Sequence, residues 1–329
     1  MWRGWLVVLL LAAGRLAHAG SPAQVAERGE RWLSSVAVGD GGFGYVKGGG
    51  AFTAPTAMAV LALEPGAVRG RALEWLRGRQ LPDGSWPVCE GDPEGSWMTA
   101  AAVLALSVSE MRKDEAAIAR GRGWLLSRSI AYRASAGAAP KNGPSEPAAT
   151  RLRAAPGWPW TPGTAPWVEP TGWALLAMAR APRQDEAGER RLAEAVDYLT
   201  GEVNRQGGWS LYESRPYPYH TALVLLALDQ LTIERSQARG LREALAGARA
   251  FLASALGASS PAQDLAWALW ALARGVPEID LVARVTQWLE ARQRPSGSWE
   301  ESPWLTAVAV TGLRALYGHD PLSAPKEHR

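Results

Sequence analysis

The feature that most constrains the fold of this 329-residue sequence is an apolar segment of nine residues that recurs six times. The six copies start close to a threonine or a proline and occupy residues 55–63, 98–106, 170–178, 220–228, 264–272 and 305–313. A helix without a polar stripe has to be buried on every side. Units that recur at a period of tens of residues bury their faces against one another. The sequence therefore predicts an array built around six buried helices.

A second kind of segment, amphipathic in pattern, precedes each apolar one. Near its end it carries an aromatic–aliphatic pair, at Trp32-Leu33, Trp75-Leu76, Trp124-Leu125, Tyr198-Leu199, Phe251-Leu252 and Trp288-Leu289. In the copy at 69–80, Leu73 and Leu76 share one helical face, whereas Glu74 and Arg77 belong to the polar face. Each unit is therefore expected to contain one outer and one inner helix.

The connection between the two helices also recurs. Most units have a glycine followed at once, or one residue later, by an aromatic residue: Gly42-Phe43, Gly84-Ser85-Trp86, Gly157-Trp158, Gly208-Trp209 and Gly297-Ser298-Trp299. Glycine permits the turn and the ring plugs the helix ends. Because no terminal unit resembles the polar cap of an open solenoid, which is the alternative, we predict an all-α (α/α)6 toroid of six helix-pair repeats. It should occupy 20–320, with a loop inserted at about 127–156 and a C-terminal tail at 321–329.

The first residues have the pattern of a secretory signal peptide. Arg3 precedes the apolar run 5–13, and a small-x-small cleavage site ends at Ala19, which predicts a signal at 1–19. The run is shorter than the roughly 20 residues of a membrane-spanning helix, so we expect a secreted or periplasmic protein. Arg3 and Arg15 belong to the signal, so the net charge of +3 falls by two to +1 for the remainder. This balance argues against a nucleic-acid partner.

Two units carry a longer motif that links the outer helix to the turn. Its elements are a basic and a small residue, the aromatic–aliphatic pair, a glutamine and Gly-x-Trp, present in full as Arg71, Ala72, Trp75, Leu76, Gln80, Gly84 and Trp86. The copy from Arg284 to Trp299 departs from it only at Val285. The motif resembles the repeats of squalene cyclases. The resemblance implies the α/α toroid of the terpenoid cyclase and protein prenyltransferase superfamily, with an apolar, isoprenoid-like ligand in its cavity.

The same resemblance limits the chemistry. Squalene-hopene cyclases protonate a double bond with an Asp-x-Asp-Asp cluster, whereas no two aspartates here lie within two residues of each other. Prenyltransferase β subunits hold zinc with an Asp, a Cys and the His of a Tyr-His-Thr. His220 matches that histidine and Glu169 stands one unit earlier, but the only cysteine, Cys89, belongs to another unit. Zinc at catalytic sites usually takes three protein ligands, so Glu169 and His220 are either a partial metal site or polar first-turn residues. No other cofactor is expected.

Aligned inner helices bring candidate ligand-binding residues to one mouth of the ring. Most of them lie at the starts of the inner helices, and two come from a proline-containing segment without helical spacing, which should line or cover the mouth. The set is Trp97, Trp160, Trp167, Glu169, Tyr219, His220, Asp264 and Trp304. The threonines at 56, 99, 171, 221 and 306 are predicted to cap the inner helices.

Three functions fit these residues. The first is an exported toroid that binds an apolar small molecule, with or without catalysis. The second is a protein- or peptide-interaction module that uses the mouth and the tryptophan-rich segment without any chemistry. The third is a zinc-dependent, prenyltransferase-like enzyme. The expected partner is therefore an apolar small molecule or a protein, and peripheral contact with a membrane is compatible with the first two.

Overall fold

The computed structural model describes residues 21–109, 112–127, 131–133, 152–154, 157–161, 164–180, 185–211, 215–231, 239–274 and 279–323. The predicted signal peptide, most of the insertion and residues 324–329 lie outside these ranges. Within the insertion, β1 (Ala131–Arg133) pairs antiparallel with β2 (Leu152–Ala154), where the sequence suggested only a loop. None of the described helices has the length and apolar composition needed to cross a membrane.

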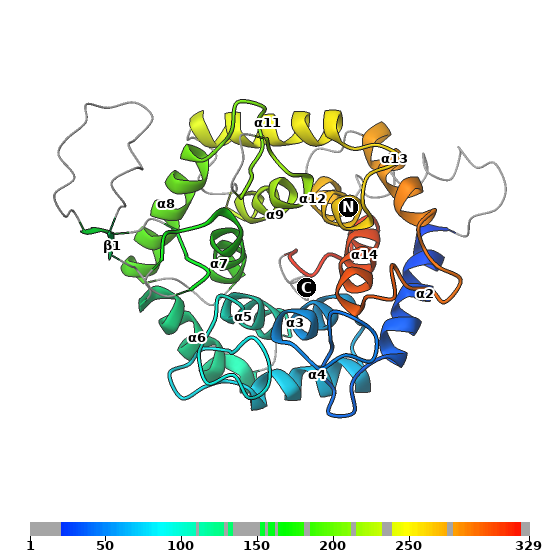
Figure 1. The fold of residues 1–329 in the computed structure, drawn as a ribbon, viewed down its shortest axis with the longest axis horizontal. Helices are drawn as coiled ribbons and strands as arrows, with labels where there is room; N and C mark the ends of the chain where they lie inside the picture. The colour runs from blue at the N-terminus through cyan, green and yellow to red at the C-terminus, as the bar shows by residue number, and fades with distance from the viewer. Residues whose placement is uncertain are drawn as a thin grey trace, which may run out of the picture.

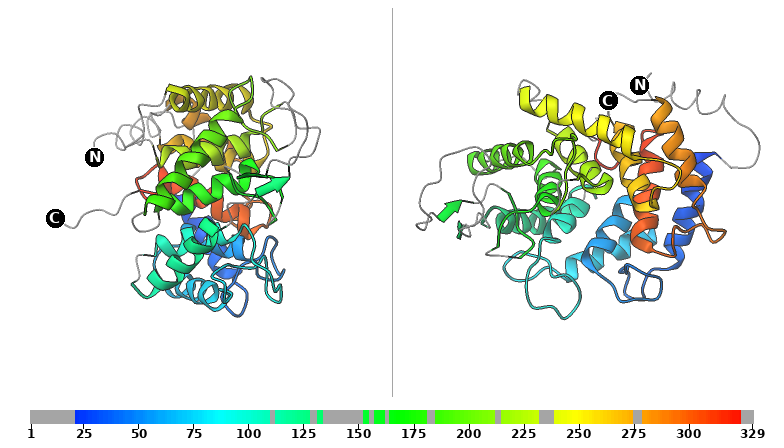
Figure 2. Two further views of the ribbon diagram at one scale, coloured as in Figure 1. Left: turned by 90° about the vertical axis from the view of Figure 1, so that its left-hand side faces the viewer. Right: turned by 45° about the horizontal axis from the view of Figure 1, so that its top comes forward.

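The helices alternate between an inner and an outer ring (Figure 1). The inner ring contains α3 (Thr53–Ala62), α5 (Thr99–Ser107), α7 (Val168–Arg180), α9 (Pro218–Asp229), α12 (Ala262–Arg274) and α14 (Pro303–Ala315). The outer ring contains α2 (Pro22–Ser35), α4 (Ala67–Gly78), α6 (Glu115–Ser127), α8 (Glu186–Gly201), α11 (Arg239–Ala255) and α13 (Ile279–Glu290), and the 3-10 helix η1 (Arg112–Asp114) precedes α6. The turned views in Figure 2 show the same pairs around the ring. The predicted all-α toroid is confirmed.

Burial separates the two rings as the sequence pattern indicates. Every residue of α5 from Thr99 to Leu106 is buried. In α13 the buried positions are instead restricted to one face, which includes Leu281, Val285 and Leu289. The hydrophobic core therefore lies within the inner ring and between the two rings, and most charged side chains of the outer helices lie outside it, with Arg191 of α8 a buried exception.

The turn between outer and inner helix is held by hydrogen bonds that recur from unit to unit. In the second unit, Trp86 Nε1 donates to the carbonyl of Leu76 at 2.7 Å, and the backbone N–H of Trp86 donates to Thr99 Oγ1 at 2.9 Å. Gln80 Nε2 donates to the carbonyl of Gly84 at 3.0 Å. Equivalent indole bonds are made by Trp158, Trp209 and Trp299. These tryptophans and the glutamine are scaffold residues.

The predicted capping role of the threonines is wrong. The N-cap of α3 is Phe52 and that of α14 is Ser302, whereas Thr56 and Thr306 lie inside the first turns. All five threonines accept a hydrogen bond from the backbone N–H of the aromatic residue in the preceding turn, at 2.8–3.0 Å. The threonine hydroxyls therefore provide hydrogen-bond acceptors for backbone N–H groups of the turns rather than for those of their own helices, which explains why buried hydroxyls are tolerated there.

Contacts between the last and the first unit close the ring. Gln293 Nε2 donates to the carbonyl of Val25 at 2.8 Å, and Arg314 Nη2 donates to Glu30 Oε2 at 2.6 Å. α14 packs against both α2 and α3. The chain is thus a closed toroid and not an open solenoid.

The segment after α14 covers the C-terminal end of α12. Trp270 Nε1 donates to Asp320 Oδ1 at 3.0 Å, and Asp320 also pairs with Arg274. Leu322 is buried, so the packed unit continues past the boundary expected at residue 320. This segment lies within the ring in the view of Figure 1. The N-terminal ends of the inner helices form the opposite end, which we call the mouth.

Candidate functional site

Three of the predicted residues form a polar cluster at the mouth. Glu169 lies in the first turn of α7, and Tyr219 and His220 lie in the first turn of α9. The Tyr219 hydroxyl donates to Glu169 Oε1 at 2.6 Å, and His220 Nε2 lies 3.3 Å from Glu169 Oε2. Because the carboxylate can only accept, this geometry assigns the imidazole proton to Nε2. Alignment of successive units therefore paired the correct residues.

Charge and burial alter the titration of the groups around this cluster. Burial, together with the negative charge of Glu169 and the hydrogen bond to it, raises the pKa of Tyr219 well above its ordinary value. Burial and the same carboxylate raise the pKa of Tyr45 to about 12. Burial also raises the pKa of Asp264, at the start of α12, although the Tyr219 backbone N–H and His220 act to lower it. The mouth is thus a desolvated, acidic environment.

Three indoles meet inside the ring below the polar cluster. Trp173 of α7, Trp267 of α12 and Trp304 of α14 have ring centroids 5.6 Å apart for the first two and 6.2 Å apart for each of the other pairs. Trp173 and Trp267 are fully buried. We call these three residues the aromatic floor. Because it fills the interior of the ring at this depth, the accessible site is the mouth above it.

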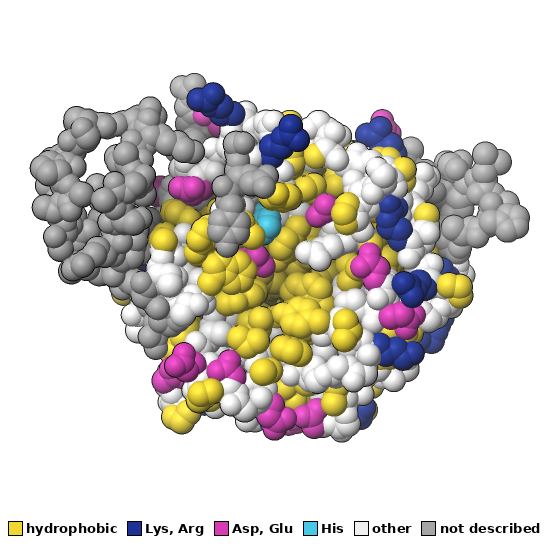
Figure 3. Space-filling view, viewed as in Figure 1, with side chains coloured by type: hydrophobic (Ala, Val, Ile, Leu, Met, Phe, Trp, Pro, Cys, Tyr) yellow, Lys and Arg dark blue, Asp and Glu magenta, His cyan; other side chains and the backbone are white. Residues whose placement is uncertain are grey.

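The polar cluster and the aromatic floor form one continuous surface. The ring centroid of Tyr219 lies 5.3 Å from that of Trp267, and the centroid of Tyr45 lies 5.8 Å from that of Trp304. Figure 3 shows hydrophobic side chains gathered at the centre of this face, with acidic and histidine side chains among them. The arrangement offers an apolar surface with hydrogen-bonding groups at one side.

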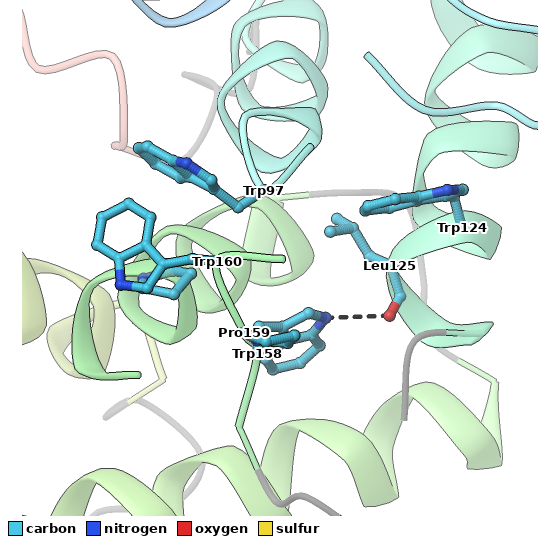
Figure 4. Close-up of a pocket in the computed structure, with 7 residues that line it drawn as sticks. Trp97, Trp124, Leu125, Trp158, Pro159 and Trp160 are labelled. Atoms are coloured by element: carbon cyan, nitrogen blue, oxygen red, sulfur yellow. Dashed lines mark hydrogen bonds between the residues drawn. The ribbon is translucent and has the colours of Figure 1, made fainter. Parts of the chain in front are cut away.

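A side pocket lies next to the mouth. It is lined by residues from the start of α5, the end of α6 and the segment before α7: Trp97, Trp124, Leu125, Trp158, Pro159, Trp160 and Pro170 (Figure 4). The Trp97 and Trp160 rings are 4.8 Å apart and nearly perpendicular, at 88°. The Trp97 centroid is also 6.4 Å from that of Trp173, so the side pocket joins the aromatic floor through Trp97.

The two tryptophans of the proline-containing segment, Trp160 and Trp167, differ in their relation to the side pocket. Trp167 is half-buried just before α7, and its backbone N–H donates to the carbonyl of Trp158 at 2.9 Å. It is not among the residues that line the side pocket, whereas Trp160 is. Trp160 therefore borders the side pocket and Trp167 does not, and their joint role at the mouth stays a prediction.

Sequence reasoning missed Tyr45, Trp173 and Trp267. The two tryptophans were interpreted as inner-helix core, yet Trp173 follows the candidate Glu169 by four residues and Trp267 follows the candidate Asp264 by three, in each case about one helical turn. That spacing could have placed them beneath the mouth. Tyr45 lies in the first turn segment, outside the aligned helices, and no spacing would have identified it.

The structure brings the two predicted zinc ligands together but places no third ligand beside them in the described chain. Glu169 and His220 are adjacent, but among the described residues there is no group of three or more His, Cys, Asp or Glu side chains that could hold a metal. His220 Nε2 faces Glu169, and buried Nδ1 has no hydrogen-bond partner in the described chain. Zinc therefore stays a prediction.

No protein-family model matches the sequence, and no curated protein matches it. Among solved structures, a ligand-free variant of the type II terpene cyclase MstE from Scytonema has a TM-score of 0.62 at 18% identity, over 91% of this chain and 97% of that chain. Another MstE variant, in complex with geranylgeranyl dihydroxybenzoate, has a TM-score of 0.61 at 18% identity over the same shares of the two chains.

Two other solved structures have similar scores. A protein from Actinoplanes has a TM-score of 0.61 at 21% identity, over 90% of this chain and 99% of that chain. A variant of the alpha-1,6-mannanase GH76A of a Salegentibacter species, in complex with alpha-1,6-mannotetrose, has a TM-score of 0.64 at 9% identity, over 92% and 100%. At these identities the likeness concerns the backbone and not the chemistry. The chain has the terpenoid cyclase-like α/α-toroid fold.

Proposed function

We propose that this chain is an exported protein that binds an apolar, isoprenoid-like small molecule across the mouth of the toroid. The observation that carries the proposal is the series of ring contacts that joins the partly exposed Trp160 and Trp97 to the partly exposed Trp304 through the buried Trp173, beside the polar cluster. The ligand's apolar chain would lie on the rings, and its polar end would face Glu169.

The shape of the surface favours an elongated ligand. The aromatic floor fills the interior, so a long chain would lie across the mouth rather than down the ring axis, and the side pocket, with a cavity volume of about 10 Å³, takes no more than a small group. Each 100 Å² of ligand surface buried on these rings would contribute about 2.5 kcal/mol of transfer free energy, from which the cost of ordering the ligand is subtracted.

The solved structures support an apolar ligand without deciding it. MstE binds a geranylgeranyl compound on this fold, whereas GH76A binds an oligosaccharide on it. The lining of this mouth favours the former, because the residues of the side pocket are all apolar or aromatic. The proposal is one of binding; a cyclase-type acid is not supported by the single half-buried Asp264.

The test is a binding titration of the mature protein with geranylgeraniol in dilute detergent, followed by tryptophan fluorescence and calorimetry. Trp97→Ala removes the ring that links the side pocket to the floor and should weaken binding about tenfold, since truncating one aromatic contact costs about 1.4 kcal/mol or more. Trp288→Ala, on outer helix α13, is the matched control and should leave the affinity unchanged. Failure of the folded wild-type protein to bind the alcohol would contradict the proposal and favour a protein-interaction module.

A further inference from the structure

At the polar end of the proposed ligand site, acidic side chains have no lysine or arginine beside them among the residues that alter their titration. Glu169 and Asp264 are carboxylates, and the tyrosines beside them keep their protons because their pKa values are raised. The charged groups that shift the pKa values of Tyr45, Tyr219 and Asp264 are Glu169 and His220, and none is a lysine or an arginine. Within the described part of the chain, Glu169 forms no ion pair with either residue type.

The hydrogen-bond donors of the cluster are already in use. The Tyr219 O–H is committed to Glu169 Oε1 and the His220 Nε2–H to Oε2. A carboxylate oxygen has two lone-pair directions, so each oxygen of Glu169 can accept one more bond. The Glu169 side chain retains 11% exposure, so it is not fully closed off from solvent. The indole Nε1 atoms of Trp173 and Trp267 have no hydrogen-bond partner in the described chain, but both rings are fully buried and out of reach of a ligand at the mouth.

Aromatic rings surround the same carboxylate. Tyr219 donates a hydrogen bond to it, its negative charge helps to raise the pKa of Tyr45, and Trp304 lies against the Tyr45 ring. A cation over such ring faces is attracted by their quadrupoles. A poorly hydrated carboxylate whose partners are a tyrosine hydroxyl and a histidine, with no lysine or arginine paired to it in the described chain, is stabilised by the same cation. An anionic head group, by contrast, would meet acceptors and negative charge.

On these grounds, and resting on the proposed function, we propose that the ligand of the mouth is an amphiphilic ammonium ion. Its amine donates hydrogen bonds to Glu169 and Asp264 and lies against the Tyr45 and Tyr219 rings, while its apolar chain follows the partly exposed rings of Trp304, Trp97 and Trp160. The proposal disfavours prenyl diphosphates as ligands, since no lysine or arginine among the described residues pairs with Glu169 in the polar cluster.

The experiment compares three probes with the same chain and different head groups: geranylgeranylamine, geranylgeraniol and geranylgeranyl phosphate. We expect the amine to bind at least about tenfold more tightly than the alcohol at neutral pH, and the phosphate to bind most weakly. Glu169→Gln keeps the shape of the side chain but removes its charge, so it should abolish the advantage of the amine and leave the alcohol's affinity unchanged. Glu202→Gln, at an exposed position after α8, is the matched control.

The outcomes separate the two proposals. If the alcohol binds and the amine binds no more tightly, or if the phosphate binds best, the ammonium proposal is wrong and the proposed function stands. If none of the three binds to folded protein, the proposed function fails as well. Because Glu169 is buried, circular dichroism must show that Glu169→Gln folds; if it does not, Asp264→Asn at the half-buried carboxyl takes its place, with a reduced amine advantage expected.

Discussion

Two glycines in the same outer helix provide a sharp test of how the inner and outer rings pack. Gly121 and Gly123 both lie in α6. A Cβ atom at Gly121 would lie 2.6 Å from Val103 Cγ2 and 2.7 Å from Trp86 Cζ3, and both of those side chains are fully buried. A Cβ atom at Gly123 would have no heavy atom within 4 Å. The alanine substitutions should therefore have opposite effects on stability.

The magnitude follows from two contributions. Replacing glycine by alanine inside a helix stabilises by about 1 kcal/mol, and this gain is common to both variants. Forcing a methyl group into a packed contact costs about 1–3 kcal/mol, and this cost applies only at Gly121. Gly123→Ala should thus be more stable than the parent protein, and Gly121→Ala less stable than Gly123→Ala by about 1–3 kcal/mol.

Chemical denaturation followed by circular dichroism measures this difference directly, because the helix-propensity gain cancels between the two variants. In thermal melts each kcal/mol corresponds to a shift of about 2–4 °C for a domain of this size. Equal stabilisation by both substitutions would refute the packing of α6 against α5 and the Trp86 turn.

Three further predictions concern the scaffold and the mouth. Trp75→Ala should lower the free energy of unfolding by about 3–5 kcal/mol, because the indole is buried and also donates to Asp40 at 2.8 Å, whereas Trp160→Ala should lower it less, because Trp160 is half-buried. Thermal melts of both variants measure the difference, and equal losses would show that Trp160 belongs to the core. Glu169→Gln should lower the pKa of Tyr219, since both the charge and the charged acceptor are lost, and an ultraviolet titration of the tyrosines would show this. In the parent protein the raised pKa of Tyr219 contributes stability that is complete below about pH 10 and is lost as the pH rises further, which thermal melts at a series of pH values would show. Metal analysis of protein purified with zinc supplied should find no bound zinc, because Glu169 and His220 are only two ligands; zinc that disappears in His220→Ala would restore the prenyltransferase-like hypothesis.

Local pattern was enough to predict the repeat architecture. The inner helices are apolar on every face and the outer helices on one, so their burial follows from residue spacing alone. The turn bonds of Trp86 and Gln80 could be predicted for a related reason: donor and acceptor lie in the same or adjacent units, at a separation that repeats along the chain. Adjacent-unit alignment also brought Glu169 to His220, which are 51 residues apart.

Contacts across the ring were decided by the tertiary structure. Trp173, Trp267 and Trp304 come from helices that are not all neighbours in sequence, and they meet because the closed ring is narrow enough for large indoles to span its interior. Neither the ring's diameter nor the side-chain rotamers are encoded in residue spacing. For the same reason the sequence by itself identified a mouth with acidic and aromatic residues, but only the folded chain showed that the mouth has a filled floor, that Tyr45 joins it, and that Trp160 borders the pocket without Trp167.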